Sequence, residues 1–214
     1  KKIRNYCNKN NIILIFDECT SGFRETFGGI HLKYKVNPDI CILGKALGNG
    51  YPITAIMGSK KIMESAQSTF ISSTFWTERT GYAAALKTLE IMEKEKSWLK
   101  IKKIGIYIKK KWKKIATKHK LKININGLSA IPSFTLSYKN WLNYKSYISF
   151  NMIKNSILAS NLIFLSINHN KKNLKKYFKI LDKSFKEIKN FEKGKNLDAL
   201  KKIPVCHDGF RRLN

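Results

Sequence analysis

Two short apolar runs, each ending in groups suited to a binding site, place the strongest constraint on the fold. Residues 12–16 are apolar and end at Asp17, and the apolar residues 40–43, which follow Asp39, run into Gly44 and Lys45. Continuous apolar runs of this length are typical of buried parallel strands. Because ligands bind beyond the carboxyl ends of such strands, we expect Asp17 and Lys45 to meet at one edge of a sheet.

A carboxylate and a lysine at one sheet edge indicate a particular kind of ligand. Asp17 can pair with a positive ring nitrogen and Lys45 can bind an aldehyde, and pyridoxal phosphate carries both groups. Simpler interpretations remain open from the spacing alone. Asp17 could cap a turn, and Lys45 could be a solvated loop residue.

The rest of the chain predicts a change of architecture near Trp98. A third strand over residues 53–57 and a helix beginning near Thr77 complete the first part. The second part begins with an amphipathic helix, in which apolar residues recur at helical spacing between lysines. Strands and helices then alternate, which predicts a small α+β domain. The expected elements are a helix over residues 101–115, strands over 130–138 and 162–167, and helices over 147–159 and 174–188.

Composition excludes several classes of protein. The chain is 43% hydrophobic, enough for a core, but no apolar run approaches the roughly 20 residues that span a bilayer. Its first residues do not resemble a signal peptide, so we expect a cytoplasmic protein. The four cysteines show no C-x-x-C spacing, and adjacent Cys206 and His207 are poorly placed to chelate together. We therefore expect neither a disulfide framework nor a metal site.

The net charge of +28 invites a nucleic-acid interpretation, but its distribution argues against one. Residues 91–214 hold 30 basic and 7 acidic residues, and only five of the 42 basic residues in the chain are arginine. Specific recognition of bases and phosphates favours arginine. Lys, Asn and Ile are abundant together and share A/T-rich codons, so drift in an A/T-rich genome explains the charge. We expect no specific nucleic-acid binding.

Two long motifs resemble class III aminotransferases. Residues 13–24, ILIFDECTSGFR, are similar to the family segment L-I-F-D-E-V-x-[ST]-G-F-R. Residues 37–55, NPDICILGKALGNGYPITA, resemble the family segment that carries the cofactor lysine nearly position for position. The resemblance continues through residues 73–79, 127–134 and 204–214, and so covers essentially the whole chain. It is strongest to the branch of glutamate-1-semialdehyde aminomutase and its aminotransferase relatives.

The resemblance implies the α/β fold of a fold-type I pyridoxal-phosphate transferase, C-terminal part only. Residues 1–97 would belong to the cofactor-binding large domain with its mostly parallel sheet, and residues 98–214 would form the small α+β domain. Family members carry a long N-terminal portion before the Asp-Glu strand. We therefore expect a fragment or a truncated product that binds pyridoxal phosphate poorly by itself.

The resemblance also implies roles for four residues. Lys45 would carry pyridoxal phosphate covalently and move a proton, and Asp17 would pair with the ring nitrogen. Cys19 stands where the family usually has a valine packed against the ring. Thr74 would bind the cofactor phosphate of a neighbouring subunit, which implies a homodimer with shared active sites. Arg24 could bind a substrate carboxylate or serve the structure.

The predicted function is transfer of an amino group between an amino donor and a keto or aldehyde acceptor. Aminomutases of the branch usually carry Gly-Thr-x-Ser-Gly-Asn-Pro where this chain has residues 73–79, and here Trp76 and Arg79 would reshape the pocket. Intramolecular transfer of the glutamate-1-semialdehyde aminomutase type is the alternative, and net exchange between separate molecules distinguishes the two. A non-catalytic basic remnant that binds acidic partners is an alternative of another class. It would bind nucleic acid through its lysines without cofactor absorbance.

Overall fold

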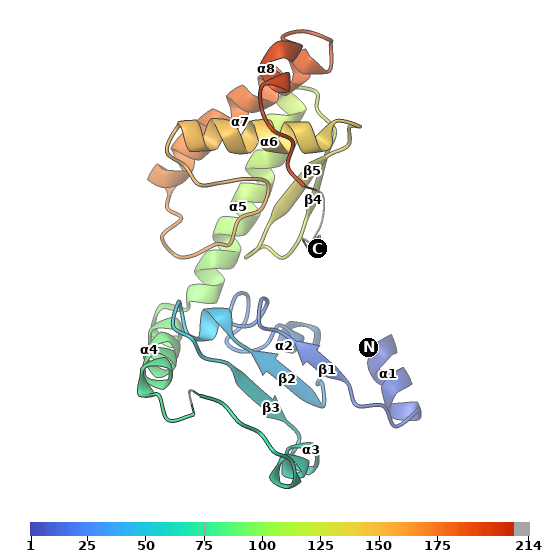
Figure 1. Cartoon of the computed structure of the whole chain (residues 1–214), viewed down its shortest axis with the longest axis vertical. Coiled ribbons are helices and arrows are strands. Elements are labelled where there is room, and N and C mark those ends of the chain that lie inside the picture. The colour runs from blue at the N-terminus through green and yellow to red at the C-terminus, as the bar shows by residue number, and fades with distance from the viewer. Residues whose placement is uncertain (75, 208–214) are drawn as a thin grey trace. The chain divides into compact units, whose positions relative to one another are not determined.

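The computed structural model describes residues 1–74 and 76–207 (Figure 1). The chain divides into two compact units, Lys1–Lys102 and Lys103–Asn214. The predicted domain boundary after residue 97 falls at the start of helix α5 (Ser97–Lys118), and the two units divide one turn further along that helix.

The first unit is built on a three-stranded sheet in the order β1-β2-β3. Strand β1 (Ile15–Asp17) pairs with β2 (Ile40–Leu43) in parallel, and β2 pairs with β3 (Ala55–Gly58) antiparallel. All three strands overlap the predicted apolar runs, although β1 begins three residues later than its run and β3 covers residues 55–58 rather than 53–57. The predicted burial of the first strand is wrong for this chain, because Ile15 is 51% exposed. Strand β1 is the edge strand of the sheet, so the chain covers it incompletely.

One face of this sheet carries the core of the first unit. Helix α4 (Arg79–Glu95) packs there, and its Ala85 is buried together with Leu43 of β2. The side chain of Glu78 begins the helix by accepting the backbone N–H groups of Thr80 and Gly81. The buried core residues are Phe23, Cys41, Leu43, Leu47 and Ala85, with Ala46, Ile53, Ala55, Leu89 and Met92 packed against them.

Short helices, the first of them α1 (Lys2–Lys9), complete the unit. Helix α1 is tied to the start of β2 because Arg4 forms a 2.7 Å ion pair with Asp39. The same Asp39 carboxylate accepts the backbone N–H of Leu14 at 2.7 Å, which fixes the entry to β1. The short elements are α1 (Lys2–Lys9), α2 (His31–Tyr34), the 3-10 helix η1 (Lys45–Leu47), α3 (Lys60–Glu64) and the 3-10 helix η2 (Ser65–Ser68).

The second unit is the expected α+β arrangement. A two-stranded antiparallel sheet, β4 (Ile123–Asn126) and β5 (Ser133–Leu136), accompanies α5, α6 (Trp141–Lys154), α7 (Lys171–Phe191) and α8 (Leu197–Lys201). The strand predicted over residues 162–167 is only an isolated bridge between Leu162 and Ser133. Ile163 donates to the carbonyl of Pro132, but proline has no N–H to return, so a regular ladder does not form.

Helix α7 shows how the lysines and the core share one element. Most of its apolar side chains are buried, with Leu181 and Phe185 fully so, while Lys176, Lys179 and Lys183 are exposed. This amphipathic pattern supports the interpretation of the charge as a solvated helix face. Within the described ranges, no helix is both long and apolar enough to cross a membrane.

Aromatic rings fill the centre of the second unit. The Phe134 ring is fully buried and lies 4.8 Å from the Trp112 ring and 5.7 Å from that of Phe185. The indole N–H of Trp112 donates to the Tyr177 hydroxyl at 2.9 Å, so the one polar group of this ring is satisfied.

Phe134→Ala should lower the free energy of unfolding by about 3–5 kcal/mol, because removing the ring leaves a cavity and loses its contacts with the neighbouring rings. Denaturant unfolding followed by tryptophan fluorescence measures this loss. Phe150→Ala is the matched control, since Phe150 of α6 is half exposed and its truncation should cost less than about 1 kcal/mol. Equal losses in the two variants would contradict the position of the core.

Candidate active site

The carboxyl ends of β1 and β2 bring Asp17 and Lys45 to the same sheet edge, as the sequence predicts. Asp17 is the last residue of β1 and lies opposite Ile42 in the parallel register. Strand β2 ends one residue later, and Lys45 follows after Gly44. Both side chains are exposed, and the charge of Lys45 contributes to stabilising the Asp17 carboxylate.

The backbone around Lys45 is held in an unusual conformation. Lys45 opens η1 with a φ of 46°, in the left-handed region that residues with a side chain rarely adopt. Leu47 of the same turn is buried in the core and anchors it. The Lys45 amine donates to the Thr20 hydroxyl oxygen at 2.5 Å. Buried and hydrogen-bonded neighbours therefore fix the direction in which this lysine leaves the sheet.

Asp17 is held as an anion. The backbone N–H of Cys19 donates to Asp17 Oδ1 at 3.0 Å, and this hydrogen bond is the main reason that the pKa of Asp17 lies below its ordinary value. The Cys19 side chain and Lys45 act in the same direction. A carboxyl group whose pKa is lowered remains ionised throughout the neutral range.

Cys19 lies between the two charged residues. A Cβ atom placed on Gly44 would lie 3.4 Å from Cys19 Sγ, so the thiol packs against the end of β2 next to Lys45. Burial, followed by the negative Asp17, raises the pKa of Cys19. The side chain is therefore a neutral thiol at neutral pH, compatible with the valine-like packing role expected for it.

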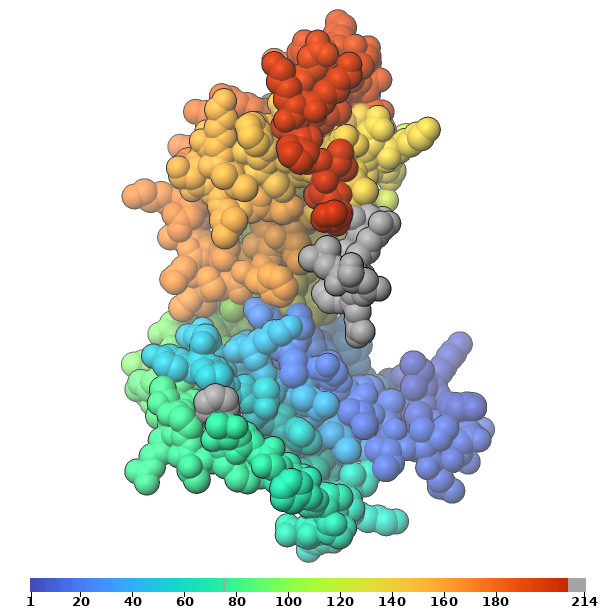
Figure 2. Space-filling model, in the orientation of Figure 1, coloured from blue at the N-terminus to red at the C-terminus, as the bar shows by residue number. Residues whose placement is uncertain are grey.

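Thr74 is not joined to these three residues within the described part of the chain. It lies in the exposed connection between η2 and α4, and no hydrogen bond among residues 1–74 and 76–207 links it to Asp17, Cys19 or Lys45. Figure 2 shows this connection, in green, on the surface of the first unit. That Thr74 binds the cofactor phosphate in a neighbouring subunit stays a prediction. Phe75 and residues 208–214, which the family resemblance includes, lie outside the described residues.

Thr20, which is not among the predicted site residues, and Arg24 together support the Lys45 side chain. The Arg24 guanidinium donates to the backbone carbonyl of Thr20 at 2.8 Å, and Thr20 in turn accepts the Lys45 amine. Burial lowers the pKa of Arg24. This contact gives Arg24 a structural role, one of the two considered for it. The sequence signal that could have identified Thr20 is a hydroxyl side chain three positions after Asp17, the last residue of β1.

Glu18 is the second residue that the sequence analysis leaves without a role. Its backbone N–H donates to the carbonyl of Ile42 at 2.8 Å and extends the β1–β2 pairing by one residue. Its carboxylate is buried and accepts the backbone N–H groups of Ile30 and His31, at the start of α2. Glu18 therefore fixes the turn that presents Asp17.

The site thus offers an anion, an amine and a neutral thiol along one open sheet edge. An ionised carboxylate suits a cationic ring nitrogen, and a primary amine suits an electrophilic carbonyl carbon. Asp17 and Lys45 carry these groups on adjacent strands, and the hydrogen bonds to Cys19 and Thr20 orient them. The donor set fits a planar cofactor that carries both features.

Sequence comparison identifies the class of protein. The profile of the family described as Aminotransferase class-III matches residues 1–187. The chain belongs to this family. The match covers both the sheet edge and most of the second unit.

Individual relatives agree with this family. A glutamate-1-semialdehyde 2,1-aminomutase of Wigglesworthia glossinidia brevipalpis is 32% identical over 209 residues, covering 88% of this chain and 48% of the relative. A 3-aminobutyryl-CoA aminotransferase of Cloacimonas acidaminovorans is 34% identical over 134 residues, covering 62% of this chain and 32% of the relative. The chain spans half or less of the length of these relatives.

The fold is shared with solved structures. The PLP internal aldimine form of the FumI protein of Sphingopyxis sp. MTA144 superposes with a TM-score of 0.80 at 22% identity, over 88% of this chain and 46% of that protein. The predicted fold class, the α/β fold of a fold-type I transferase, is confirmed, and the chain matches part of that fold.

Proposed function

We propose that this chain supplies the lysine and the ring-nitrogen partner of a pyridoxal-phosphate-dependent aminotransferase. The enzyme transfers an amino group between an amino donor and a keto or aldehyde acceptor. The observation that carries the proposal is the placement of Asp17 and Lys45 at one sheet edge by the β1–β2 register. Membership of the class-III aminotransferase family supports it.

Four residues would hold the cofactor. Asp17 would pair with the ring nitrogen, Lys45 with the aldehyde carbon, and Cys19 would lie against the ring. Thr74 would bind the phosphate of the cofactor that a second subunit holds. When bound, pyridoxal phosphate supplies an electron-withdrawing ring that stabilises negative charge on the substrate carbon.

The chain's own residues would handle protons and orientation. Asp17 remains ionised and would keep the ring nitrogen of the bound cofactor protonated. The Lys45 amine, in its neutral form, would take the proton from the substrate carbon and pass it to the former aldehyde carbon of the cofactor. Thr20 orients that amine through its hydroxyl oxygen, and Arg24 holds the Thr20 backbone in place.

We also propose a homodimer with shared active sites in the cytoplasm. The connection that carries Thr74 exposes large apolar side chains, with Phe70 at 95% and Trp76 at 59% exposure, and a partner subunit would cover them. All four cysteines are free, as is usual for a protein in a reducing compartment.

Intramolecular amino transfer is the second candidate. The Wigglesworthia relative that covers 88% of this chain is an aminomutase, whereas the aminotransferase relative covers 62%. The departure of residues 73–79 from the aminomutase segment favours transfer between separate molecules.

Two chimaeras test the proposed function. In each, this chain replaces the matching part of one relative, either the Wigglesworthia aminomutase or the Cloacimonas aminotransferase. We expect both to transfer amino groups from a donor to an acceptor, measured by quantifying the aminated product. Isomerisation of glutamate-1-semialdehyde without any exchange between added molecules would favour the aminomutase. Chimaeras that fold and bind pyridoxal phosphate yet move no amino group would contradict the proposal.

A further inference from the structure

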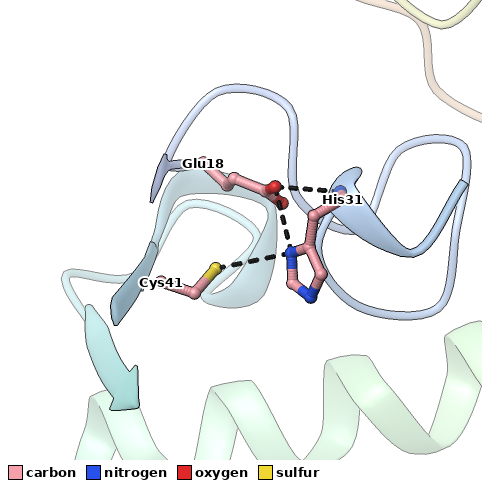
Figure 3. Close-up of side chains that lie close together, drawn as sticks. All are labelled: Glu18, His31 and Cys41. Carbon is pink, nitrogen blue, oxygen red and sulfur yellow. Dashed lines mark hydrogen bonds and ion pairs between the residues drawn. The ribbon is translucent and has the colours of Figure 1, made fainter. Parts of the chain in front are cut away.

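Three potential metal ligands that the proposed chemistry does not use meet beside β2 (Figure 3). Glu18 follows β1, His31 begins α2, and Cys41 lies within β2. His31 Nδ1 lies 3.1 Å from Glu18 Oε1 and 3.9 Å from Cys41 Sγ, and the three ligand atoms all lie within 4.8 Å of one another. Glu18 and Cys41 are buried, and the His31 side chain is 13% exposed.

We propose that Glu18, His31 and Cys41 bind a divalent transition-metal ion of the zinc type. A carboxylate oxygen, an imidazole nitrogen and a thiolate are the ligands that zinc prefers. With bond lengths of about 2.0–2.1 Å to oxygen and nitrogen and about 2.3 Å to sulfur, the two measured separations give ligand–metal–ligand angles of roughly 98° and 125°. These two angles lie on either side of the tetrahedral value. The third pair, the Glu18 oxygen and Cys41 Sγ, lies within 4.8 Å and must be no more than about 4.4 Å apart to bind the same ion.

The contacts of Glu18 and the glycine at position 29 arrange the ligand atoms in a way that suits a bound ion. The backbone N–H of His31 donates to Glu18 Oε1 at 2.9 Å, and that of Ile30 donates to Oε2, so the carboxylate is oriented by a second set of contacts. A Cβ atom on Gly29 would collide with both His31 Nδ1 and Glu18 Oε2, so glycine keeps the ligand atoms accessible to one another. A water would complete the coordination as fourth ligand.

Ion binding requires a defined movement of protons. A hydrogen bond joins His31 Nδ1 and Glu18 Oε1 in the free chain. On binding, the imidazole hydrogen resides on Nε2 and leaves the Nδ1 lone pair to the metal. The thiol proton of Cys41 passes to solvent, and the sulfur binds as thiolate.

Cobalt(II) titration of the full chain tests the proposal, because thiolate bound to cobalt has a charge-transfer absorption in the near ultraviolet. We expect this band to saturate at one equivalent of cobalt and to disappear when zinc is added. Cys41→Ser should abolish the band, and His31→Gln should weaken cobalt binding by at least roughly 10-fold. Cys206→Ser is the matched control, since Cys206 is a partly buried free cysteine of the second unit, and it should retain the band.

Circular dichroism of each variant separates loss of the site from loss of the fold. If Cys41→Ser fails to fold, His31→Gln decides, because its ring is partly exposed and its replacement is tolerated more readily. A folded wild-type chain without the cobalt band would overturn the proposal and leave the cluster as a hydrogen-bond network that holds α2. A band that survives in Cys41→Ser would overturn it as well.

Discussion

Lys45→Ala is expected to abolish amino transfer in a chimaera that joins this chain to the matching half of the Wigglesworthia relative. The variant removes both the amine that binds the cofactor and the group that moves the substrate proton. A positioned acid–base group contributes up to about 10⁴-fold, so turnover should fall by at least that factor. Steady-state rates and the visible absorbance of the bound cofactor measure the two losses separately.

A second lysine supplies the control for this loss. Lys60 follows strand β3, which runs antiparallel to β2, so Lys60 lies at the end of the sheet opposite to Lys45. Its side chain is 90% exposed, and it pairs only loosely with Glu64 at 3.7 Å. Lys60→Ala should leave turnover and cofactor absorbance within about twofold of the parent. Activity that survives in Lys45→Ala at the level of Lys60→Ala would remove Lys45 from the site.

Asp17→Asn is expected to have the next largest effect. Asparagine keeps the size of the side chain and can still accept the N–H of Cys19, but the anion that holds the ring nitrogen protonated is lost. Turnover should fall on the order of 10²- to 10³-fold, the range for removing one preorganised electrostatic partner. The cofactor should remain covalently attached, because Lys45 is unchanged.

The pH dependence follows from the pKa of Asp17. Hydrogen bonding from Cys19 and the charge of Lys45 lower this pKa, so the carboxylate loses its charge only when the pH falls below the ordinary aspartate range. The parent should therefore keep its activity through mildly acidic pH as far as Asp17 is concerned. Asp198→Asn, at a 91% exposed carboxylate in α8, is the control and should behave like the parent. Equal turnover in Asp17→Asn and Asp198→Asn would contradict the assignment.

The sheet edge could be predicted because both strands carry their own signals. An apolar run ending in Asp17 and another running into Gly44-Lys45 fix the direction of each strand, and parallel pairing then brings the two ends together. The amphipathic helices of the second unit were equally predictable, since α5 and α7 alternate buried and lysine-bearing faces.

Contacts made by turns could not be predicted in the same way. The segment that follows β1 holds three such residues: Glu18, Thr20 and His31. Their contacts depend on the path of the backbone, which hydrogen bonds rather than sequence periodicity determine. Strand β4 was missed because four residues, Ile-Asn-Ile-Asn, are too short for a pattern to stand out. The strand expected over residues 162–167 does not form, because Pro132 opposite it has no N–H to complete the pairing.

The site of covalent attachment of the cofactor tests the central claim most directly. The chimaera with the Wigglesworthia half, loaded with pyridoxal phosphate, is reduced with borohydride, digested and mapped by mass spectrometry. A pyridoxyl group on the peptide that contains Lys45, and its absence from that peptide in Lys45→Ala, is the predicted result. A pyridoxyl group on another lysine while Lys45 remains unmodified would contradict the account.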